Sequence, residues 1–174
     1  MKAKLKVIQG DITHLPVDVI VNAANTSLLG GCGVDGAIHR AAGPDLLEEC
    51  KKLGGCGTGQ AKLTKAYGLP AQYIIHAVGP VWRGGSKGEP QLLASCYENS
   101  LKIARNSGAK TIAFPAISCG IYGYPISQAV SIAVHETANF LELYNQIETV
   151  YFVCFDEPTF EAYQQAVSSL HYDS

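Results

Sequence analysis

Short apolar runs and longer amphipathic segments alternate along the chain. Continuous or alternating apolar runs predict strands at residues 4–9, 17–23, 61–67, 73–78, 111–117 and 150–155. Apolar residues that recur every three or four positions predict helices at residues 37–53, 91–107, 127–144 and 159–170. Strands that alternate with helices are typical of α/β proteins. We therefore predict a three-layer α/β/α sandwich with a mixed, largely parallel central sheet.

Details of these segments refine the expected topology. Residues 4–9 alternate polar and apolar and the 61–67 strand is short, so we expect both to pair antiparallel at or near an edge. Gly43 and Pro44 are expected to kink the first helix, and Pro115 to end the pairing of its strand. The chain has no internal repeat or linker, and its 174 residues predict one domain over residues 1–174.

Composition narrows the classes of function. Apolar residues make up 47% of the chain and charged residues 16%, as expected for a globular protein with a sizeable core. The net charge of −2 argues against a general nucleic-acid or membrane-surface binder, so direct nucleic-acid binding is not expected. No apolar run approaches the roughly 20 residues of a membrane helix. The basic N-terminus lacks the apolar segment of a secretory signal, and we expect a cytoplasmic protein.

The six cysteines match neither a disulfide framework nor a metal site, because no C-x-x-C pair or adjacent histidine ligand pattern is present. We expect most of them to be small buried thiols in a reducing compartment. Cys32 and Cys119 differ, since both lie in glycine-rich loops. Cys119 has no obvious base nearby to make it a nucleophile.

Two polar, glycine-rich loops stand out as candidate ligand sites. Residues 22–36 combine two asparagines, four glycines and Asp35, and follow an apolar strand. Residues 118–125 likewise lie between a strand and a helix. Loops of this kind meet at the carboxyl ends of parallel strands. Carboxamides can bind hydroxyl groups, while glycines let backbone N–H groups approach a ligand closely. A polyhydroxylated, phosphorylated ligand suits these loops.

Other chemistries fit less well. Residues 31–36 match G-x-G-x-x-G, but the motif starts eight residues beyond the strand, and the acidic residue expected about 20 residues further on is missing. The chain contains neither G-x-x-x-x-G-K-[ST] nor G-x-S-x-G. His76 lies inside an apolar strand, which favours a hydrogen-bonded core histidine. His39 lies one helical turn past Asp35, where packing is favoured over a role behind the site.

Six ordered motifs span nearly the whole chain, at residues 10–13, 21–25, 30–43, 76–80, 116–125 and 151–156. These motifs resemble those of the macrodomain family, specifically its MacroD-type ADP-ribose-binding hydrolases. The match is closest to bacterial O-acetyl-ADP-ribose deacetylases, some of which are also described as regulators of ribonuclease III.

The resemblance implies a set of binding residues. Asp11 would accept a hydrogen bond from the adenine amino group, with the Ile12 backbone N–H beside it. Phe155 would pack on the adenine ring, with core packing as an equally good alternative. Asn25 would hold hydroxyls of the distal ribose, whereas Asn22 is the better candidate for a turn-forming asparagine. The diphosphate would be wrapped by the backbone N–H groups of a loop, as in an anion-binding nest at a helix start, formed by Ser118, Cys119, Gly120, Ile121 and Tyr122.

The resemblance also implies the chemistry. Gly33, Val34 and Asp35 would line the other side of the diphosphate and the distal ribose. Asp35 would act as general base, with Asn25 beside it, on a water that attacks an ester carbonyl; its alternative role is capping a helix that starts at Ala37. O-acetyl-ADP-ribose and ADP-ribose are the implied small molecules, and mono-ADP-ribosylated proteins and ribonuclease III the further partners. No metal or redox cofactor is required. A non-catalytic ADP-ribose reader would not depend on Asp35.

Two positions depart from the usual family pattern. Cys32 stands where a glycine is usual, and Cys119 where threonine or another small residue is common. Cys32 adds a side chain to a loop whose backbone is expected to need positive φ or close ligand approach. This substitution leaves binding in place but affects the expected turnover.

Overall fold

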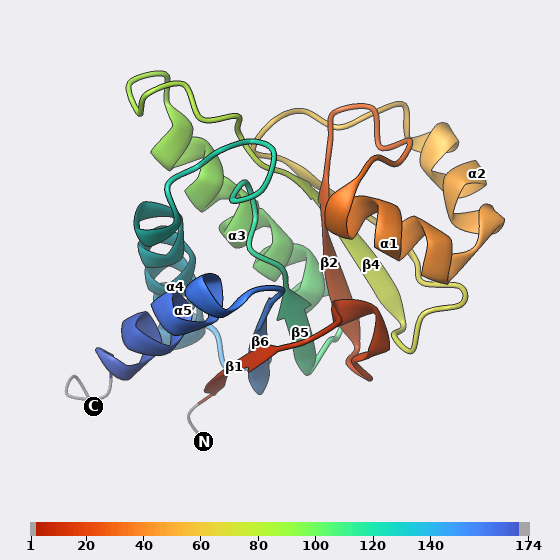
Figure 1. Cartoon of the computed structure of the whole chain (residues 1–174). Coiled ribbons are helices and arrows are strands. Elements are labelled where there is room, and N and C mark those ends of the chain that lie inside the picture. Colours follow the sequence, from red (N-terminus) through yellow and green to blue (C-terminus); the bar gives the residue numbers. More distant parts are fainter. Residues whose placement is uncertain (1–2, 171–174) are drawn as a thin grey trace.

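The computed structural model describes residues 3–170, in which strands and helices alternate around one sheet (Figure 1). The strands are β1 (Lys4–Gln9), β2 (Val19–Ala24), β3 (Ala61–Lys65), β4 (Tyr73–Val78), β5 (Thr111–Phe114) and β6 (Thr149–Cys154). The helices are α1 (Gly33–Ala42), α2 (Pro44–Leu53), α3 (Glu89–Asn106), α4 (Ile126–Leu143) and α5 (Glu157–Ser168), with a 3-10 turn η1 (Ile12–His14) after β1.

The sheet is mixed and largely parallel, as predicted. Its order is β1-β6-β5-β2-β4-β3. β3 pairs antiparallel with β4 at one edge, which confirms the expectation for that strand. The expectation for β1 was wrong in direction: β1 lies at the other edge but runs parallel to β6. An alternating pattern indicates that one face of a strand is exposed to solvent. Edge strands have this exposure in both parallel and antiparallel pairs.

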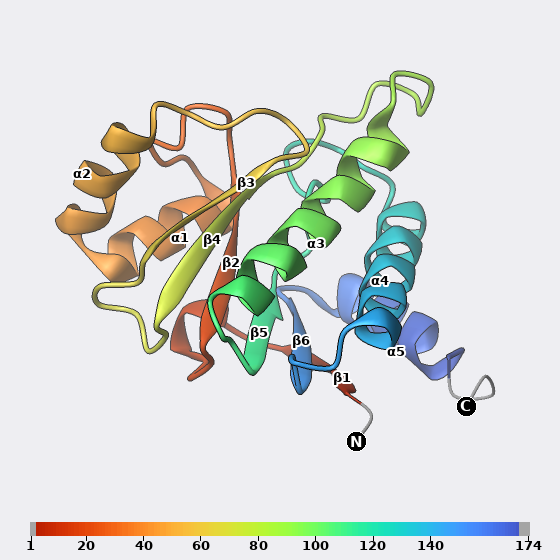
Figure 2. The same ribbon diagram turned by 180° about the vertical axis from the view of Figure 1, so that it is seen from behind.

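Helices cover both faces of the sheet, and each face has its own core. Alternate residues of the central strands point to opposite sides: Val19 and Val21 of β2 join the cluster beneath α3, α4 and α5. Ile20, from the same strand, joins the cluster beneath α1 and α2. Figure 2 shows α3 crossing its face of the sheet with α4 beside it. The predicted three-layer α/β/α sandwich is therefore confirmed.

The predicted first helix is two helices. The chain breaks at Gly43, whose φ of 94° ends α1, and Pro44 begins α2. α1 also begins at Gly33, four residues before the predicted start. Its first turn carries two glycines and an aspartate, so the apolar periodicity does not reveal it. Pro115 has the expected effect, because β5 ends at Phe114.

The central strands part at their carboxyl ends. β2 and β5 pair only at Val19–Ile112 and Ile20–Ala113, and β2 continues to Ala24. β2 leads into α1 on one face, whereas β5 leads into α4 on the other. This is a topological switch point, and ligands of open α/β sheets bind in the crevice outside such a point. The loops after β2 and β5 rise together at this end of the sheet (Figure 1).

Within residues 3–170, no helix is both long enough and apolar enough to span a bilayer.

We predict that Gly36→Ala destabilises the protein by about 1–3 kcal/mol, although alanine normally favours a helix. A Cβ at Gly36 would lie 2.6 Å from the Gly31 carbonyl oxygen, so the loop before α1 would have to move. Gly10→Ala is the control, because apart from Gly10 itself and its two chain neighbours no described residue has a heavy atom within 4 Å of its Cβ position. Urea unfolding of both variants measures the difference. A Gly36→Ala protein as stable as the wild type would contradict the close approach.

Candidate active site

The loop after β2 is shaped by the Asn25 side chain. Its Oδ1 accepts hydrogen bonds from the Ser27 backbone N–H at 3.1 Å and the Ser27 hydroxyl at 2.6 Å. Its Nδ2 donates to the Gly30 carbonyl at 3.0 Å. The side chain that was predicted to hold ribose hydroxyls is half-buried and braces the loop from within.

Asp35 lies in the first turn of α1 and is 4% exposed. Its Oδ1 accepts a hydrogen bond from Asn22 Nδ2 at 2.8 Å, and His39 Nε2 lies 3.5 Å from the same oxygen. Burial raises the pKa of the Asp35 carboxyl, while the Asn22 hydrogen bond and His39 act in the opposite direction. Cys32, not Asp35, is the N-cap of α1, so the capping role considered for Asp35 was wrong.

Asp35 and Asn25 flank the backbone of Gly31. A Cβ placed on Gly31 would lie 3.1 Å from Asp35 Oδ2 and 3.4 Å from Asn25 Nδ2. Gly31 itself is exposed. The second carboxylate oxygen therefore faces the exposed backbone of the loop, while the first is held inside. Only a glycine keeps the space between the two side chains free.

Two stretches of backbone N–H groups line the switch point. In the loop after β5, the amides of Gly123 and Tyr124 donate to Gly120 O at 3.0 Å and Ser118 O at 2.9 Å. The amides of residues 119–122 have no backbone acceptor among the described residues. The first amides of α1, at Gly33 and Val34, likewise lack a side-chain cap. Such groups attract an anion.

The close contact between β4 and this loop requires Gly79. Ser118 has a φ of 68° and is buried, and a Cβ on Gly79 would lie 2.2 Å from its hydroxyl. The backbone N–H of Trp82 donates to Tyr122 O at 2.8 Å, and the ring centroids of Trp82 and Tyr124 lie 4.7 Å apart. The loop after β4 thus braces the loop after β5.

The loop after β4 is itself fixed by a buried carboxylate. Glu89 accepts from the backbone N–H groups of Arg83, Gly85 and Lys87 at 2.7–3.0 Å. Burial acts to raise the pKa of Glu89, but these hydrogen bonds outweigh it and lower the pKa to about 2. The carboxylate therefore stays charged and holds the loop at neutral pH.

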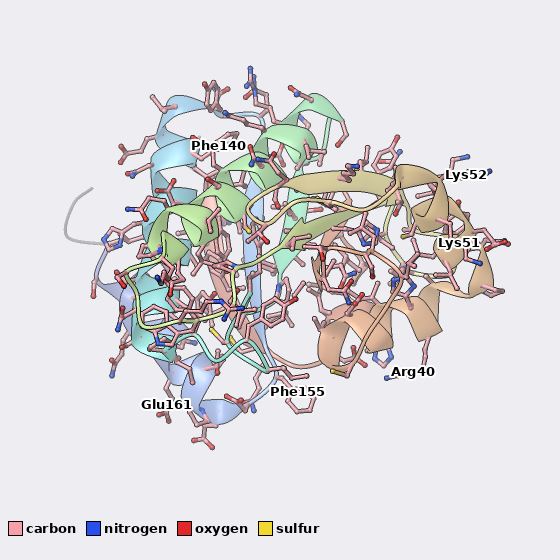
Figure 3. All side chains as sticks on the ribbon, turned by 90° about the horizontal axis from the view of Figure 1, so that it is seen from above. Arg40, Lys51, Lys52, Phe140, Phe155 and Glu161 are labelled. Carbon is pink, nitrogen blue, oxygen red and sulfur yellow. The ribbon has the colours of Figure 1, made fainter. Side chains whose placement is uncertain are left out.

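The residues predicted to bind adenine meet at the ends of β1 and β6. The Gly10 N–H donates to Cys154 O at 3.0 Å, which brings Asp11 and Phe155 to adjacent strand ends. Asp11 caps η1, and its hydrogen bonds from the Thr13 hydroxyl and N–H lower the pKa of its carboxyl. Ile12 beside it is buried. Phe155 is 92% exposed and projects outward in Figure 3, so the core-packing alternative was wrong.

Cys32 is less disruptive than expected. Its φ of −107° is ordinary extended backbone, and the left-handed conformations fall on Gly30 and Gly33 on either side. The expectation of a positive φ at Cys32 was therefore wrong, while its effect on ligand approach and turnover stays a prediction. Burial, then the nearby Asp156 charge, raises the pKa of the Cys119 thiol to about 11, so it is a protonated thiol at neutral pH.

The remaining cysteines follow the expectation of small buried thiols. All six are free, and four are buried: Cys50, Cys56, Cys96 and Cys154. Within residues 3–170, no group of three or more His, Cys, Asp or Glu side chains is arranged to hold a metal ion.

Sequence reasoning missed the role of Asn22. It is a β2 residue with no exposed surface, not a turn residue, and its register partner on β4 is His76. Asn22 Nδ2 lies 3.1 Å from His76 Nδ1, and His76 Nε2 lies 2.9 Å from Thr64 Oγ1. The prediction of a hydrogen-bonded core histidine is confirmed. The available signal was one polar residue in each of two apolar strands.

The fold and this rim of loops define a class: an α/β sheet covered on both faces, with polar side chains and backbone amides gathered at its switch point. The macro domain family model matches residues 21–133. A protein of Escherichia fergusonii named O-acetyl-ADP-ribose deacetylase is 55% identical over 172 residues, covering 97% of each chain. The chain belongs to the macrodomain family.

Solved structures agree with this assignment. The Oceanobacillus iheyensis macrodomain with ADP is 40% identical, with a TM-score of 0.95 over 99% of this chain and 94% of that one. The Trypanosoma brucei macrodomain in complex with ADP-ribose is 46% identical, with a TM-score of 0.88 over 94% of this chain and 68% of that one.

We predict that, because of His76, the stability of the folded protein decreases as the pH falls below about 6.5. Burial, then His39, lowers its pKa to about 3, so the unfolded chain binds a proton that the folded protein does not. Stability then rises with pH across this window, and the His76 contribution is about 2 kcal/mol smaller at pH 5 than at pH 7.

Urea unfolding of the wild type and His76→Gln at both pH values measures this difference. The other groups facing His76 are Asn22, Thr64, Cys50 at 4.0 Å and the His39 ring at 6.4 Å, and the variant retains them all. Equal pH dependence in the two proteins would refute the assignment to His76.

Proposed function

We propose that this protein hydrolyses O-acetyl-ADP-ribose to ADP-ribose and acetate. One observation carries the proposal: the buried Asp35 carboxylate is held through Oδ1, while Oδ2 faces the exposed Gly31 backbone in the loop that leads into the first amides of α1. The deacetylase name of the Escherichia fergusonii relative supports the reaction. The ADP-ribose complex of the Trypanosoma brucei macrodomain supports the ligand.

The ligand would extend along the rim from β1 to β2. Asp11 and Phe155 bind the adenine end, where an acceptor carboxylate and an exposed aromatic ring follow adjacent strand ends. The amides of residues 118–122, with those of Gly33 and Val34, bind the diphosphate. Asn25 binds the distal ribose next to Asp35.

The chemistry is a base-assisted ester hydrolysis. Asp35 Oδ2 accepts a proton from a water as that water attacks the acetyl carbonyl. Backbone N–H groups of the loops stabilise the tetrahedral oxyanion, which collapses to acetate while the ribose oxygen takes up a proton. A raised pKa makes Asp35 a stronger base than an exposed aspartate and keeps its proton transfer closer to neutral pH.

The same geometry suits ester-linked ADP-ribose on a protein aspartate or glutamate, because the reacting bond is again an ester of the distal ribose. A reader without catalysis would bind through Asp11 and the loops and would not need Asp35. Regulation of ribonuclease III rests on the family resemblance alone. Co-purification that survives Asp35→Ala would separate that role from hydrolysis.

Asp35→Asn is predicted to lower kcat for O-acetyl-ADP-ribose by about 10²–10⁴-fold, because the amide accepts the Asn22 hydrogen bond but cannot take a proton. The Kd for ADP-ribose is expected to stay within about threefold. Acetate release and calorimetric ADP-ribose binding measure the two quantities.

Asp11→Asn is the matched control at the other end of the rim. It retains an acceptor for Thr13 but loses the charged acceptor for the adenine amino group, so the Kd for ADP-ribose rises about tenfold or more. Its kcat stays near the wild-type value. ADP-ribose binding without turnover in the wild type would favour the reader and refute the hydrolase.

Phe155→Ala is predicted to weaken ADP-ribose binding by about 1–3 kcal/mol, the range found for stacking of a base on an aromatic ring. Stability should change by no more than about 0.5 kcal/mol, because the ring is 92% exposed. Exposed Leu143 on α4 provides the control, since Leu143→Ala removes a similarly exposed apolar side chain away from the rim. Unaltered binding in Phe155→Ala would contradict its role.

A further inference from the structure

A buried hydrogen-bond chain runs from the edge strand β3 to Asp35. Thr64 Oγ1 lies 3.0 Å from Lys65 O and 2.9 Å from His76 Nε2. His76 Nδ1 lies 3.1 Å from Asn22 Nδ2, which lies 2.8 Å from Asp35 Oδ1. Thr64 is 2% exposed, and His76 and Asn22 have no exposed surface. Water therefore does not take the place of these contacts.

The donors and acceptors in this chain are fixed by elimination. The Asp35 carboxylate only accepts, so the Asn22 atom that faces it is the amide nitrogen. That nitrogen donates its second hydrogen toward His76, so His76 Nδ1 accepts and carries no proton. The neutral imidazole then has its hydrogen on Nε2, where Thr64 Oγ1 accepts it. The threonine hydroxyl donates its own hydrogen to Lys65 O, so each donor in the chain of hydrogen bonds has an acceptor.

We propose that His76, held as the Nε2–H tautomer by Thr64, is a positioning residue that directs the Asn22 amide to donate to Asp35. With the opposite tautomer, Nδ1–H would face the Asn22 NH₂ group, and the amide would turn its oxygen toward His76. That oxygen lies in the place of the donor to Asp35, so the carboxylate would lose its anchor. This inference rests on the proposed hydrolase function and extends it to residues that do not contact the substrate.

The Asn22 donor determines the orientation of the Asp35 carboxylate. A donor on Oδ1 leaves Oδ2 directed at the Gly31 backbone, where the proposed water is activated. His39, at 3.5 Å from Oδ1, is not aligned for a hydrogen bond and does not replace Asn22. Loss of the donor frees the carboxylate to rotate, which lowers turnover more than it lowers binding at the loops and the adenine end.

Two substitutions of His76 test the roles of its two ring nitrogens separately. In His76→Asn, the side-chain oxygen takes the place of Nδ1 and accepts from Asn22. In His76→Gln, the side-chain amide reaches the place of Nε2 and Thr64 but offers no acceptor at the position of Nδ1. We expect His76→Gln to lower kcat about tenfold or more, as supporting hydrogen-bond partners commonly do. We expect His76→Asn to restore kcat to within about threefold of the wild type, with the ADP-ribose Kd within about threefold in both.

The outcomes separate the inference from the function it extends. No turnover by the wild type refutes the hydrolase. Turnover by the wild type with undiminished kcat in His76→Gln overturns the positioning role, as does an equal loss of kcat and of ADP-ribose binding in both variants.

A measurement on the wild type decides the matter even if neither variant folds. ¹⁵N NMR of protein labelled at histidine reports which ring nitrogen carries the hydrogen. We expect His76 to be the Nε2–H tautomer, without titration from about pH 5.5 to 8, because burial lowers its pKa to about 3. An Nδ1–H tautomer, or a His76 signal that titrates in this range, overturns the proposal.

Discussion

Asn22 is a polar side chain in a fully buried stretch of the central strand, and its amide has to find hydrogen-bond partners there. β2 lies between β5 and β4, with helices over both faces, so solvent cannot supply those partners. The NH₂ group finds them in Asp35 on α1 and His76 on β4, whereas the side-chain oxygen has no hydrogen-bond partner among the described residues. The Asn22–Asp35 hydrogen bond links the first turn of α1 to the sheet and holds the buried carboxylate, while burial raises the pKa of Asp35 and this hydrogen bond acts to lower it. The same hydrogen bond therefore belongs to the core and to the candidate site.

The rest of the site is held by rigid elements that lie next to the crevice. α1 presents its first amides from a helix end, and the loop after β5 is braced by Trp82 from the loop after β4. Glu89 fixes that second loop through three backbone hydrogen bonds, and its low pKa keeps them in place over the whole neutral range. Such preorganised donors need little rearrangement when an anion arrives. Exposed Phe155 is the exception, since little in the protein covers its ring.

Much of this arrangement was predictable because it depends on local pattern. Apolar periodicity located every strand and four of the helices to within a few residues, and the order of strands and helices indicated a largely parallel sheet. The loops with Asn25, Asp35 and Ser118 were identified from their glycines and polar side chains, since parallel strands bring such loops to one rim. The start of α1 was missed because its first turn has almost no apolar residues. The direction of β1 was missed because edge exposure looks the same in parallel and antiparallel pairs.

The sequence by itself determined the fold class, the family resemblance and the two loops, because periodicity, glycine and carboxamide residues act over a few neighbouring positions. Only the tertiary structure decided that Asn22 is a core residue and that Cys32 adopts an ordinary backbone conformation. It also decided that Phe155 is exposed. The fold connects four residues by consecutive hydrogen bonds: Thr64, His76, Asn22 and Asp35. Those facts depend on register between strands that are far apart in sequence, and on which face of each strand is buried. Hydrogen bonds across such distances leave no local pattern in the chain.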